Sequence, residues 1–163
     1  MKDICKFNEV TKDDFEGICS LITSKEELFL VYPKGKYPFT VKQVEEIYST
    51  RKELTVVTEG EKIIGFANLY NYKPEESAFI GNVIIDKNHR GNGLGKRIVL
   101  YMLKIAFEKL NLPEVRISVF SENTTAVLLY SNIGFVPYSI EERTDSAGNR
   151  VALIHMKLER SAI

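Results

Sequence analysis

Blocks of apolar residues separated by polar and turn-forming residues alternate along the chain between strand-like and helix-like patterns. Short β-rich runs predict strands at residues 4–10, 54–58, 62–70, 79–85, 115–120, 135–141 and 151–157. Helical periodicity and end signals predict helices at residues 13–22, from Thr40 to about Arg51, 94–109 and 124–132. Residues 24–39, rich in Pro, Gly and aromatic side chains, are predicted to form a connection. The predicted order is β-α-α-β-β-β-α-β-α-β-β.

Local signals support these boundaries. Thr11 is a candidate N-cap for the first helix, and Thr40 with Gln43 has the spacing of a capping box for the second. Glu59-Gly60 is a hairpin signal between two predicted strands. The apolar positions of residues 94–109 fall on one face, so we expect that helix to pack on a sheet.

Length and charge narrow the class of protein. A chain of 163 residues with 44% hydrophobic content predicts one domain, residues 1–163, with a single core. Lys plus Arg and Asp plus Glu are equal at 22 each, so no overall field attracts nucleic acid or an anionic membrane. No apolar run approaches the roughly 18 residues of a spanning helix, and the N-terminus lacks an apolar signal core. We therefore expect a cytoplasmic protein without a nucleic-acid or membrane partner.

A basic loop rich in glycine joins the strand ending near residue 85 to the helix that follows. Gly91, Gly93 and Gly95 carry no Cβ, so backbone N–H groups at a helix N-terminus can face an anion. A P-loop needs four residues between its first glycine and the Gly-Lys, followed by Ser or Thr, whereas here three residues intervene before Gly95-Lys96 and Arg97 follows. A dinucleotide fingerprint needs Gly-x-Gly-x-x-Gly, whereas this loop reads Gly-x-Gly-x-Gly and lies late in the chain. The loop thus predicts a phosphate cradle of another kind.

Two sequence blocks carry a family resemblance. The loop Arg90-Gly91-Asn92-Gly93-Leu94-Gly95 fits the Arg/Gln-x-x-Gly-x-Gly/Ala pyrophosphate loop of the GNAT superfamily of acyl-CoA-dependent N-acetyltransferases. Further along, Asn123-x-x-Ala126-x-x-Leu129-Tyr130-x-x-x-Gly134-Phe135 resembles that superfamily's second block. The chain therefore resembles a member of the GNAT superfamily. The resemblance implies a single α/β (α+β) domain with a mixed, mostly antiparallel central sheet flanked by about four helices.

The resemblance also implies an activity and a cofactor site. The expected reaction moves the acetyl group of acetyl-CoA to a primary amine by direct attack in a ternary complex, with coenzyme A as product and no metal. The strand before the loop is expected to bulge and pair with pantetheine through its backbone, where an N–H can stabilise an oxyanion. Asn123 is expected to hydrogen-bond the cofactor, and an N-cap role is equally open. The implied cofactor-binding residues are Val83, Ile84, Ile85, Arg90, Gly91, Asn92, Gly93, Leu94, Gly95, Lys96 and Asn123.

The resemblance assigns the general acid and leaves the base open. Tyr130 resembles the residue that protonates the coenzyme A thiolate in this superfamily, and plain packing is its alternative role. Many members place a Glu on one of two central strands, but residues 80–85 contain none, and Ser118 stands where several relatives carry Glu. The remaining candidates are water or a loop carboxylate from Glu26, Glu27, Glu75 or Glu76.

The acceptor is expected to be an amine that loses its proton easily, because no obvious base is present. This favours a small amine, an amino acid or a peptide N-terminus. Glu26 or Glu27 could pair a cationic substrate, and several aromatic residues could wall its pocket or equally well be core packing: Phe29, Tyr32, Tyr37, Phe39, Tyr70 and Tyr72. A catalytically silent acyl-CoA-binding sensor or scaffold module with the same fold is the alternative function. Dimers are common in families of this kind, which leaves a homodimer open.

Overall fold

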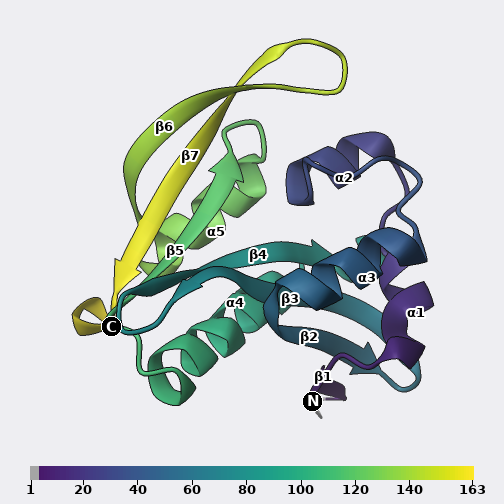
Figure 1. Ribbon diagram of the computed structural model, residues 1–163, viewed down its shortest axis with the longest axis horizontal. Coiled ribbons are helices and arrows are strands. Elements are labelled where there is room, and N and C mark those ends of the chain that lie inside the picture. The colour runs from purple at the N-terminus through teal and green to yellow at the C-terminus, as the bar shows by residue number, and fades with distance from the viewer. Residues whose placement is uncertain (1–3) are drawn as a thin grey trace.

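A seven-stranded sheet forms the centre of the molecule, with strand order β1-β2-β3-β4-β5-β7-β6 (Figure 1). The structure is a computed structural model and describes residues 4–163. Its strands are β1 (Cys5–Glu9), β2 (Lys52–Glu59), β3 (Lys62–Lys73), β4 (Ser77–Ile85), β5 (Glu114–Phe120), β6 (Val136–Thr144) and β7 (Arg150–Glu159). Within the described chain, β4 and β5 are the parallel pair and the other neighbouring strands are antiparallel. The predicted mixed, mostly antiparallel sheet is confirmed.

Helices cover both faces of this sheet. One core lies under α4 (Leu94–Lys104) and α5 (Thr124–Ile133) and includes Leu69, Ile80 and Ile117. The other lies under α1 (Phe15–Cys19), α2 (Lys25–Val31) and α3 (Val41–Thr50) and includes Phe66 and Ile84. The first three helices cover only the half of their face that contains β2, β3 and β4. At the border of this covered half, Phe29 of α2 stacks on Phe120 of β5.

A bulge in β4 moves its last residues to the opposite face of the sheet. Asn68 pairs with Gly81 but Phe66 pairs with Ile84, so β4 carries one extra residue at this point. Asn82, inside the bulge, has a φ of 48°. Because side chains alternate along a strand, Ile80 and Ile84 would share a face without the extra residue. With it, Ile80 packs under α4 and α5 whereas Ile84 packs under the first three helices.

Beyond the bulge, β4 and β5 separate. Their parallel pairing runs from Ser77 opposite Glu114 to Ile80 opposite Ile117 and ends there. Figure 1 shows the two arrows diverging toward their C-terminal ends, with α2 near the open end. The backbone groups of β4 after Ile80 therefore have no partner on β5, which leaves them available to a bound molecule.

The segment predicted as a connection, residues 24–39, contains a helix, so that prediction was wrong. Ser24 caps α2, because its Oγ accepts a hydrogen bond from the backbone N–H of Glu27 at 3.1 Å. Pro33, Gly35 and Pro38 all follow α2, so the breakers that suggested a loop act only after the helix has ended. The described chain consequently has five α-helices, one more than predicted.

Smaller differences concern helix ends. The first predicted helix is split into a 3₁₀ turn, Lys12–Asp14, and the short α1. The helix predicted to reach residue 109 changes from α to a π-helical segment, Ile105–Lys109. Thr40 caps α3 as predicted, since its Oγ1 accepts from the N–H of Gln43 at 3.4 Å. The side chain of Gln43, however, bonds the backbone of Lys36 and Pro38 instead of completing a capping box.

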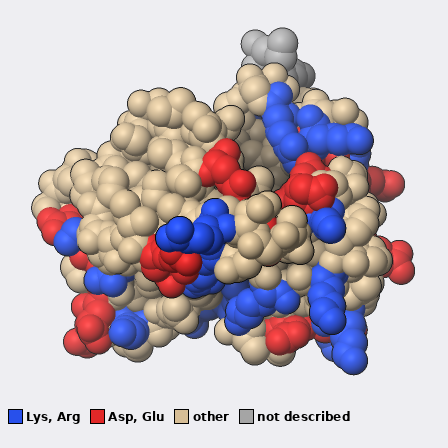
Figure 2. Space-filling view, turned by 90° about the horizontal axis from the view of Figure 1, so that it is seen from above, with Lys and Arg blue, Asp and Glu red and all other residues tan. Residues whose placement is uncertain are grey.

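The surface matches the even charge balance of the sequence. On the face seen in Figure 2, basic and acidic side chains lie next to one another instead of forming a field of one sign. Such a face offers no extended track for a polyanion. Among the described residues, no helix is long and apolar enough to cross a bilayer.

Candidate active site

The glycine-rich loop leads into α4 through left-handed backbone conformations and has open space around it. Gly91 and Gly93 have φ values of 83° and 81°, a region that favours glycine, and Gly93 is the N-cap of α4. A Cβ added at either position would meet no atom within 4 Å. The first backbone N–H groups of an α-helix have no partner inside the helix. The loop thus presents donors and the positive end of the α4 dipole to open space, as an anion requires.

A cavity of about 620 Å³, here called the loop cavity, lies between this loop, the end of β4 and α5. Nearly all of the predicted cofactor-binding residues line it: Val83, Ile84, Ile85, Arg90, Gly91, Gly93, Gly95, Lys96 and Asn123. Asn92 lies exposed in the loop, and Leu94 is buried in the core under α4. The structure therefore brings two distant blocks of sequence, the loop and the start of α5, to one cavity.

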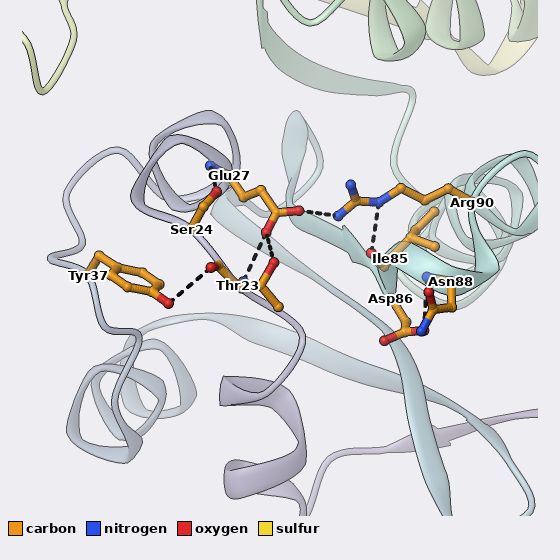
Figure 3. Close-up of polar contacts among 8 residues, drawn as sticks. All are labelled: Thr23, Ser24, Glu27, Tyr37, Ile85, Asp86, Asn88 and Arg90. Carbon is orange, nitrogen blue, oxygen red and sulfur yellow. Dashed lines mark hydrogen bonds and ion pairs between the residues drawn. The ribbon is translucent and has the colours of Figure 1, made fainter.

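Arg90 and Glu27 form an ion pair across this cavity (Figure 3). Figure 3 shows their side chains pointing toward one another from the loop and from α2, with Arg90 Nη2 at 2.7 Å from Glu27 Oε2. Arg90 Nε also donates to the carbonyl of Ile85 at 3.2 Å. Glu27 accepts two more hydrogen bonds, from the backbone N–H and the hydroxyl of Thr23, at 2.9 and 2.7 Å.

This environment keeps Glu27 ionised. Burial by itself would raise the pKa of its carboxyl, but the hydrogen bonds from Thr23 and Arg90 and the charge of Arg90 outweigh it and lower the pKa to about 2. A carboxylate held this way is a poor proton acceptor near neutral pH. The structure therefore argues against Glu27 as the general base.

A second cavity, of about 350 Å³ and here called the sheet cavity, opens where β4 and β5 separate. Its walls come from β3 to β7 and from the connection after α2, and its polar lining includes Arg51, Tyr70, Asn82, Ser118, Glu141, Arg143 and His155. The two cavities share five lining residues: Leu30, Val31, Val83, Asn123 and Tyr130. The two spaces therefore meet beside the β4 bulge and the side chain of Tyr130.

Tyr130 lies at this junction near the end of α5 and is only 6% exposed. Burial raises the pKa of its phenol, so the hydroxyl stays protonated and able to donate. Its ring contacts Phe135 edge to face at 6.1 Å, and no side chain of the described chain hydrogen-bonds its hydroxyl. Asn123 caps α5 through Oδ1, which accepts from the N–H of Ala126 at 3.4 Å, and its amide nitrogen is left for a ligand.

Three side chains form a hydrogen-bonded chain on the wall of the sheet cavity. His155 Nδ1 lies 2.7 Å from Ser118 Oγ, and His155 Nε2 lies 2.7 Å from Glu141 Oε1. Because a carboxylate only accepts, the ring proton belongs on Nε2, and Nδ1 then accepts from the Ser118 hydroxyl. Hydrogen bonds from Arg143 first, and from His155, lower the pKa of Glu141 and keep it ionised. This is the geometry of a proton relay.

Sequence reasoning missed His155 and Glu141 in this relay. Ser118 stands where several relatives carry Glu, but its partners come from β7 and β6, far along the chain. The pairing of β5 with β7 sets Ser118 directly opposite His155. The available signal was that His155, one of only two histidines in the sequence, falls in a predicted strand.

The other predicted acidic candidates do not reach either cavity. Glu75 and Glu76 lie in the turn between β3 and β4, at the opposite end of β4 from Ile85. Glu26 is exposed on the first turn of α2. Of the four predicted acidic candidates, Glu27 is thus the one that lines a cavity, where it is already paired with Arg90.

Of the predicted aromatic walls, Tyr32 and Tyr70 line the sheet cavity. The others have structural contacts. Phe29 stacks on Phe120 at 4.6 Å, and Phe39 is buried in the core beneath the first three helices. Tyr37 donates to the carbonyl of Thr23, and the ring of Tyr72 lies beneath Lys52.

Comparisons with known proteins agree with this geometry. A sequence model described as the acetyltransferase (GNAT) family matches residues 19–135. A UPF0039 protein of Schizosaccharomyces pombe is 25% identical over 122 residues, which cover 75% of this chain and 77% of that protein. A spermidine N(1)-acetyltransferase of Vibrio cholerae is 31% identical over 102 residues, 58% of each protein, so this chain spans less than two thirds of that relative.

A solved structure shows the same fold over nearly the whole length. It is a spermidine N-acetyltransferase from Vibrio cholerae in complex with CoA and spermine, and it matches with a TM-score of 0.82 and 23% sequence identity. The match covers 99% of this chain and 98% of the other.

Proposed function

This chain belongs to the acetyltransferase (GNAT) family, and we propose that it transfers the acetyl group of acetyl-CoA directly to a primary amine of a small molecule. The observation that carries the proposal is the junction of the two cavities. The loop cavity suits the cofactor and the sheet cavity suits the acceptor, and Tyr130 and Val83 border both. An amine and a thioester that occupied them would meet beside the β4 bulge, which is what direct transfer requires.

The loop cavity fits the phosphates and pantetheine of acetyl-CoA. Gly91 and Gly93 hold the loop in conformations that keep a phosphate site free of side-chain atoms, and Lys96 adds positive charge. The unpaired backbone of β4 after Ile80 suits the amides of pantetheine. Acetyl-CoA supplies an activated acyl group there, and the backbone N–H of Val83, beside the bulge, stabilises negative charge on the acyl oxygen.

On the acceptor side, Ser118, His155 and Glu141 form the route for the amine proton. The Ser118 hydroxyl oxygen accepts a proton from the incoming ammonium group as its own proton passes to His155 Nδ1. Glu141 accepts the hydrogen bond from Nε2 and stabilises the imidazolium that results. The neutral amine then forms the new C–N bond.

On the cofactor side, Tyr130 lines both cavities at their junction, which makes its hydroxyl the candidate proton donor where the C–S bond would break. It donates its proton to the departing sulfur, and solvent restores that proton afterwards. The acetyl group ends on the amine nitrogen. The His155 imidazolium returns its proton to solvent, and the amide nitrogen then releases its last proton along the same route through Ser118.

The relatives support a small amine as the acceptor class. Enzymes named for spermidine are among them, and one structure with this fold holds spermine together with CoA. Both molecules are small primary amines. Spermidine and spermine are named for those proteins. Which acceptor this chain binds depends on the residues that line its own sheet cavity.

The experiment that tests the proposal follows free thiol and product mass together. Purified protein is incubated with acetyl-CoA and a panel of primary amines. We expect thiol release above the amine-free rate, with one N-acetylated amine formed for each thiol. Tyr130→Phe is the matched control, because it keeps the ring that contacts Phe135 and removes only the hydroxyl.

The alternative function, a silent acyl-CoA-binding module, gives a different result. Calorimetry would then show that acetyl-CoA binds, whereas no amine would raise thiol release above the amine-free rate. Absence of acetyl-CoA binding would contradict both functions.

A further inference from the structure

Arg51 reaches the sheet cavity without an acidic partner. It follows α3 as the C-cap residue and is half-buried. Its Nη1 donates to Asn68 Oδ1 at 3.2 Å, and its guanidinium carbon lies 4.3 Å from the centre of the Tyr70 ring and 5.9 Å from that of Tyr32. No carboxylate of the described chain forms an ion pair with it. The guanidinium is thus held by an amide and two aromatic rings, with donors left over.

The backbone of β4 is shaped to admit this side chain. A Cβ added at Gly81 would lie 2.4 Å from Arg51 Nη1 and 2.5 Å from the Tyr70 ring. Glycine at this position therefore lets the guanidinium lie flat against β4, next to the bulge. Any larger residue would displace it.

A buried amide network fixes the direction of Arg51. Asn82 Nδ2 donates to the carbonyl of Val31 at 2.8 Å, and Asn82 Oδ1 accepts from Asn68 Nδ2 at 2.7 Å. Because the Asn68 amide nitrogen points to Asn82, its side-chain oxygen points to Arg51. Both asparagines are buried, at 0% and 5% exposure for Asn68 and Asn82, so this arrangement is rigid.

The charge of Arg51 is not compensated by its surroundings. Burial lowers the pKa of the guanidinium from its usual value, yet an arginine stays protonated in proteins. Lys34 and Arg143 also line the sheet cavity, and Glu141 is its carboxylate. Glu141 is already engaged by Arg143 and His155. The cavity therefore carries an excess of positive charge and lacks an anion.

We propose that Arg51 binds a carboxylate of the acceptor, and that the acceptor is therefore an amino acid rather than a polyamine. The inference rests on the proposed function and names its substrate class. Both ends of such a ligand find a partner near one point of the sheet cavity, because Arg51 lies against Gly81, and Gly81 and Ser118 directly follow the paired residues Ile80 and Ile117. A molecule that spans Arg51 and Ser118 has its carboxylate and its amine only a short distance apart, as an amino acid does.

A polyamine has the opposite charge pattern. It carries only cationic groups, and binding would bring them next to Arg51 and Arg143 with one engaged carboxylate to offset them. Bringing like charges close together in a half-buried site raises the free energy of the complex. This chain and its spermidine-named relatives would thus share a fold and differ in acceptor.

The test compares matched acceptors with and without the carboxylate. Thiol release is measured with free amino acids, with their amides, with the amines left after removal of the carboxyl group, and with spermidine and spermine. A hydrogen bond to a charged group predicts that kcat/KM falls roughly 10- to 100-fold from an amino acid to its amide. The KM for acetyl-CoA stays the same, since Arg51 does not border the loop cavity.

Variants assign the effect to Arg51. Arg51→Gln should raise the KM for the amino acid and abolish the preference for the amino acid over its amide. Arg51→Lys should retain part of this preference, because lysine keeps the positive charge but lacks the paired N–H donors of a guanidinium. Gly81→Ala should act like Arg51→Gln while leaving the arginine in the chain. Arg150→Gln is the control, because it removes a surface arginine of the β6–β7 hairpin that pairs with Glu142.

The outcomes separate this inference from the function beneath it. Faster acetylation of spermine, or equal rates for amino acids and their amides, would overturn the inference and leave the acetyltransferase intact. An amino-acid preference that survives Arg51→Gln would assign the carboxylate to another group and also overturn it. If none of the amines raised thiol release above the amine-free rate, the proposed function would be contradicted, and the inference would fail with it.

Discussion

The ion pair between Glu27 and Arg90 makes part of the stability of this protein dependent on pH. The folded pKa of Glu27 is about 2, well below the value of about 4.3 for a free Glu side chain. For a group whose pKa is lowered by folding, the added stability is present above the unfolded pKa. It is lost as the pH falls through the range from about 4.3 to about 2.

The structure bounds the size of this effect. The difference between the two pKa values corresponds to at most about 3 kcal/mol of unfolding free energy. Glu27 is 22% exposed and Arg90 is 48% exposed, so solvent screens their attraction. The hydrogen bonds from Thr23 are less affected by this screening. We therefore expect Glu27→Gln to lower the unfolding free energy at neutral pH by about 1 to 2 kcal/mol.

Urea denaturation followed by circular dichroism measures this difference at a series of pH values. The gap between the wild type and Glu27→Gln should be full near pH 7 and should shrink toward zero near pH 2, where Glu27 becomes protonated. Glu26→Gln is the matched control, since Glu26 is the neighbouring exposed carboxylate on the same turn of α2. It should show no comparable gap.

Two results would refute this reasoning. If the difference in unfolding free energy between the wild type and Glu27→Gln did not change with pH, Glu27 would stabilise the fold through its shape and not through its charge. A fall in kcat of about 10²-fold or more, with acetyl-CoA saturating, would show that Glu27 is the general base after all.

Three further substitutions test the site. Tyr130→Phe should lower kcat by about 10² to 10⁴-fold with little change in the KM for acetyl-CoA, and an unchanged kcat with chemistry rate-limiting would make Tyr130 a packing residue. His155→Gln should make kcat/KM fall more steeply as the pKa of the acceptor amine rises, and parallel dependences in variant and wild type would remove His155 from the proton route. Gly93→Val should abolish calorimetric binding of coenzyme A. Gly148→Val, at an equally strained glycine in the β6–β7 turn, should retain it, and equal loss in both would point to misfolding.

Much of the cofactor side could be predicted from the sequence because its signals are local. Gly91, Gly93 and Lys96 lie within one loop, and the start of α5 is marked by Asn123. Each needs only its own turn or helix end to form the feature that the residues predict. The α2 helix shows the limit of this reasoning, since Ser24 and Glu27 carried a cap signal that the nearby prolines and aromatics obscured.

The acceptor side depends on contacts that sequence spacing does not reveal. Arg51, Ser118, Glu141 and His155 come from four separate strands or their ends, and strand order brings them together. The bulge at Asn82 also changes which residues face each core, and no periodicity predicts a single extra residue. The roles of the site residues, the cytoplasmic location and the homodimer stay predictions.

The shared wall between the two cavities has a consequence for how this protein could diverge. A smaller side chain at Val31 or Val83 would admit a bulkier amine, but it would also widen the space at the acyl end. Variation there would change tolerance for longer acyl thioesters and for larger acceptors together. Arg51 and His155 border only the sheet cavity, so substitutions at them can change acceptor choice while the acyl donor stays the same.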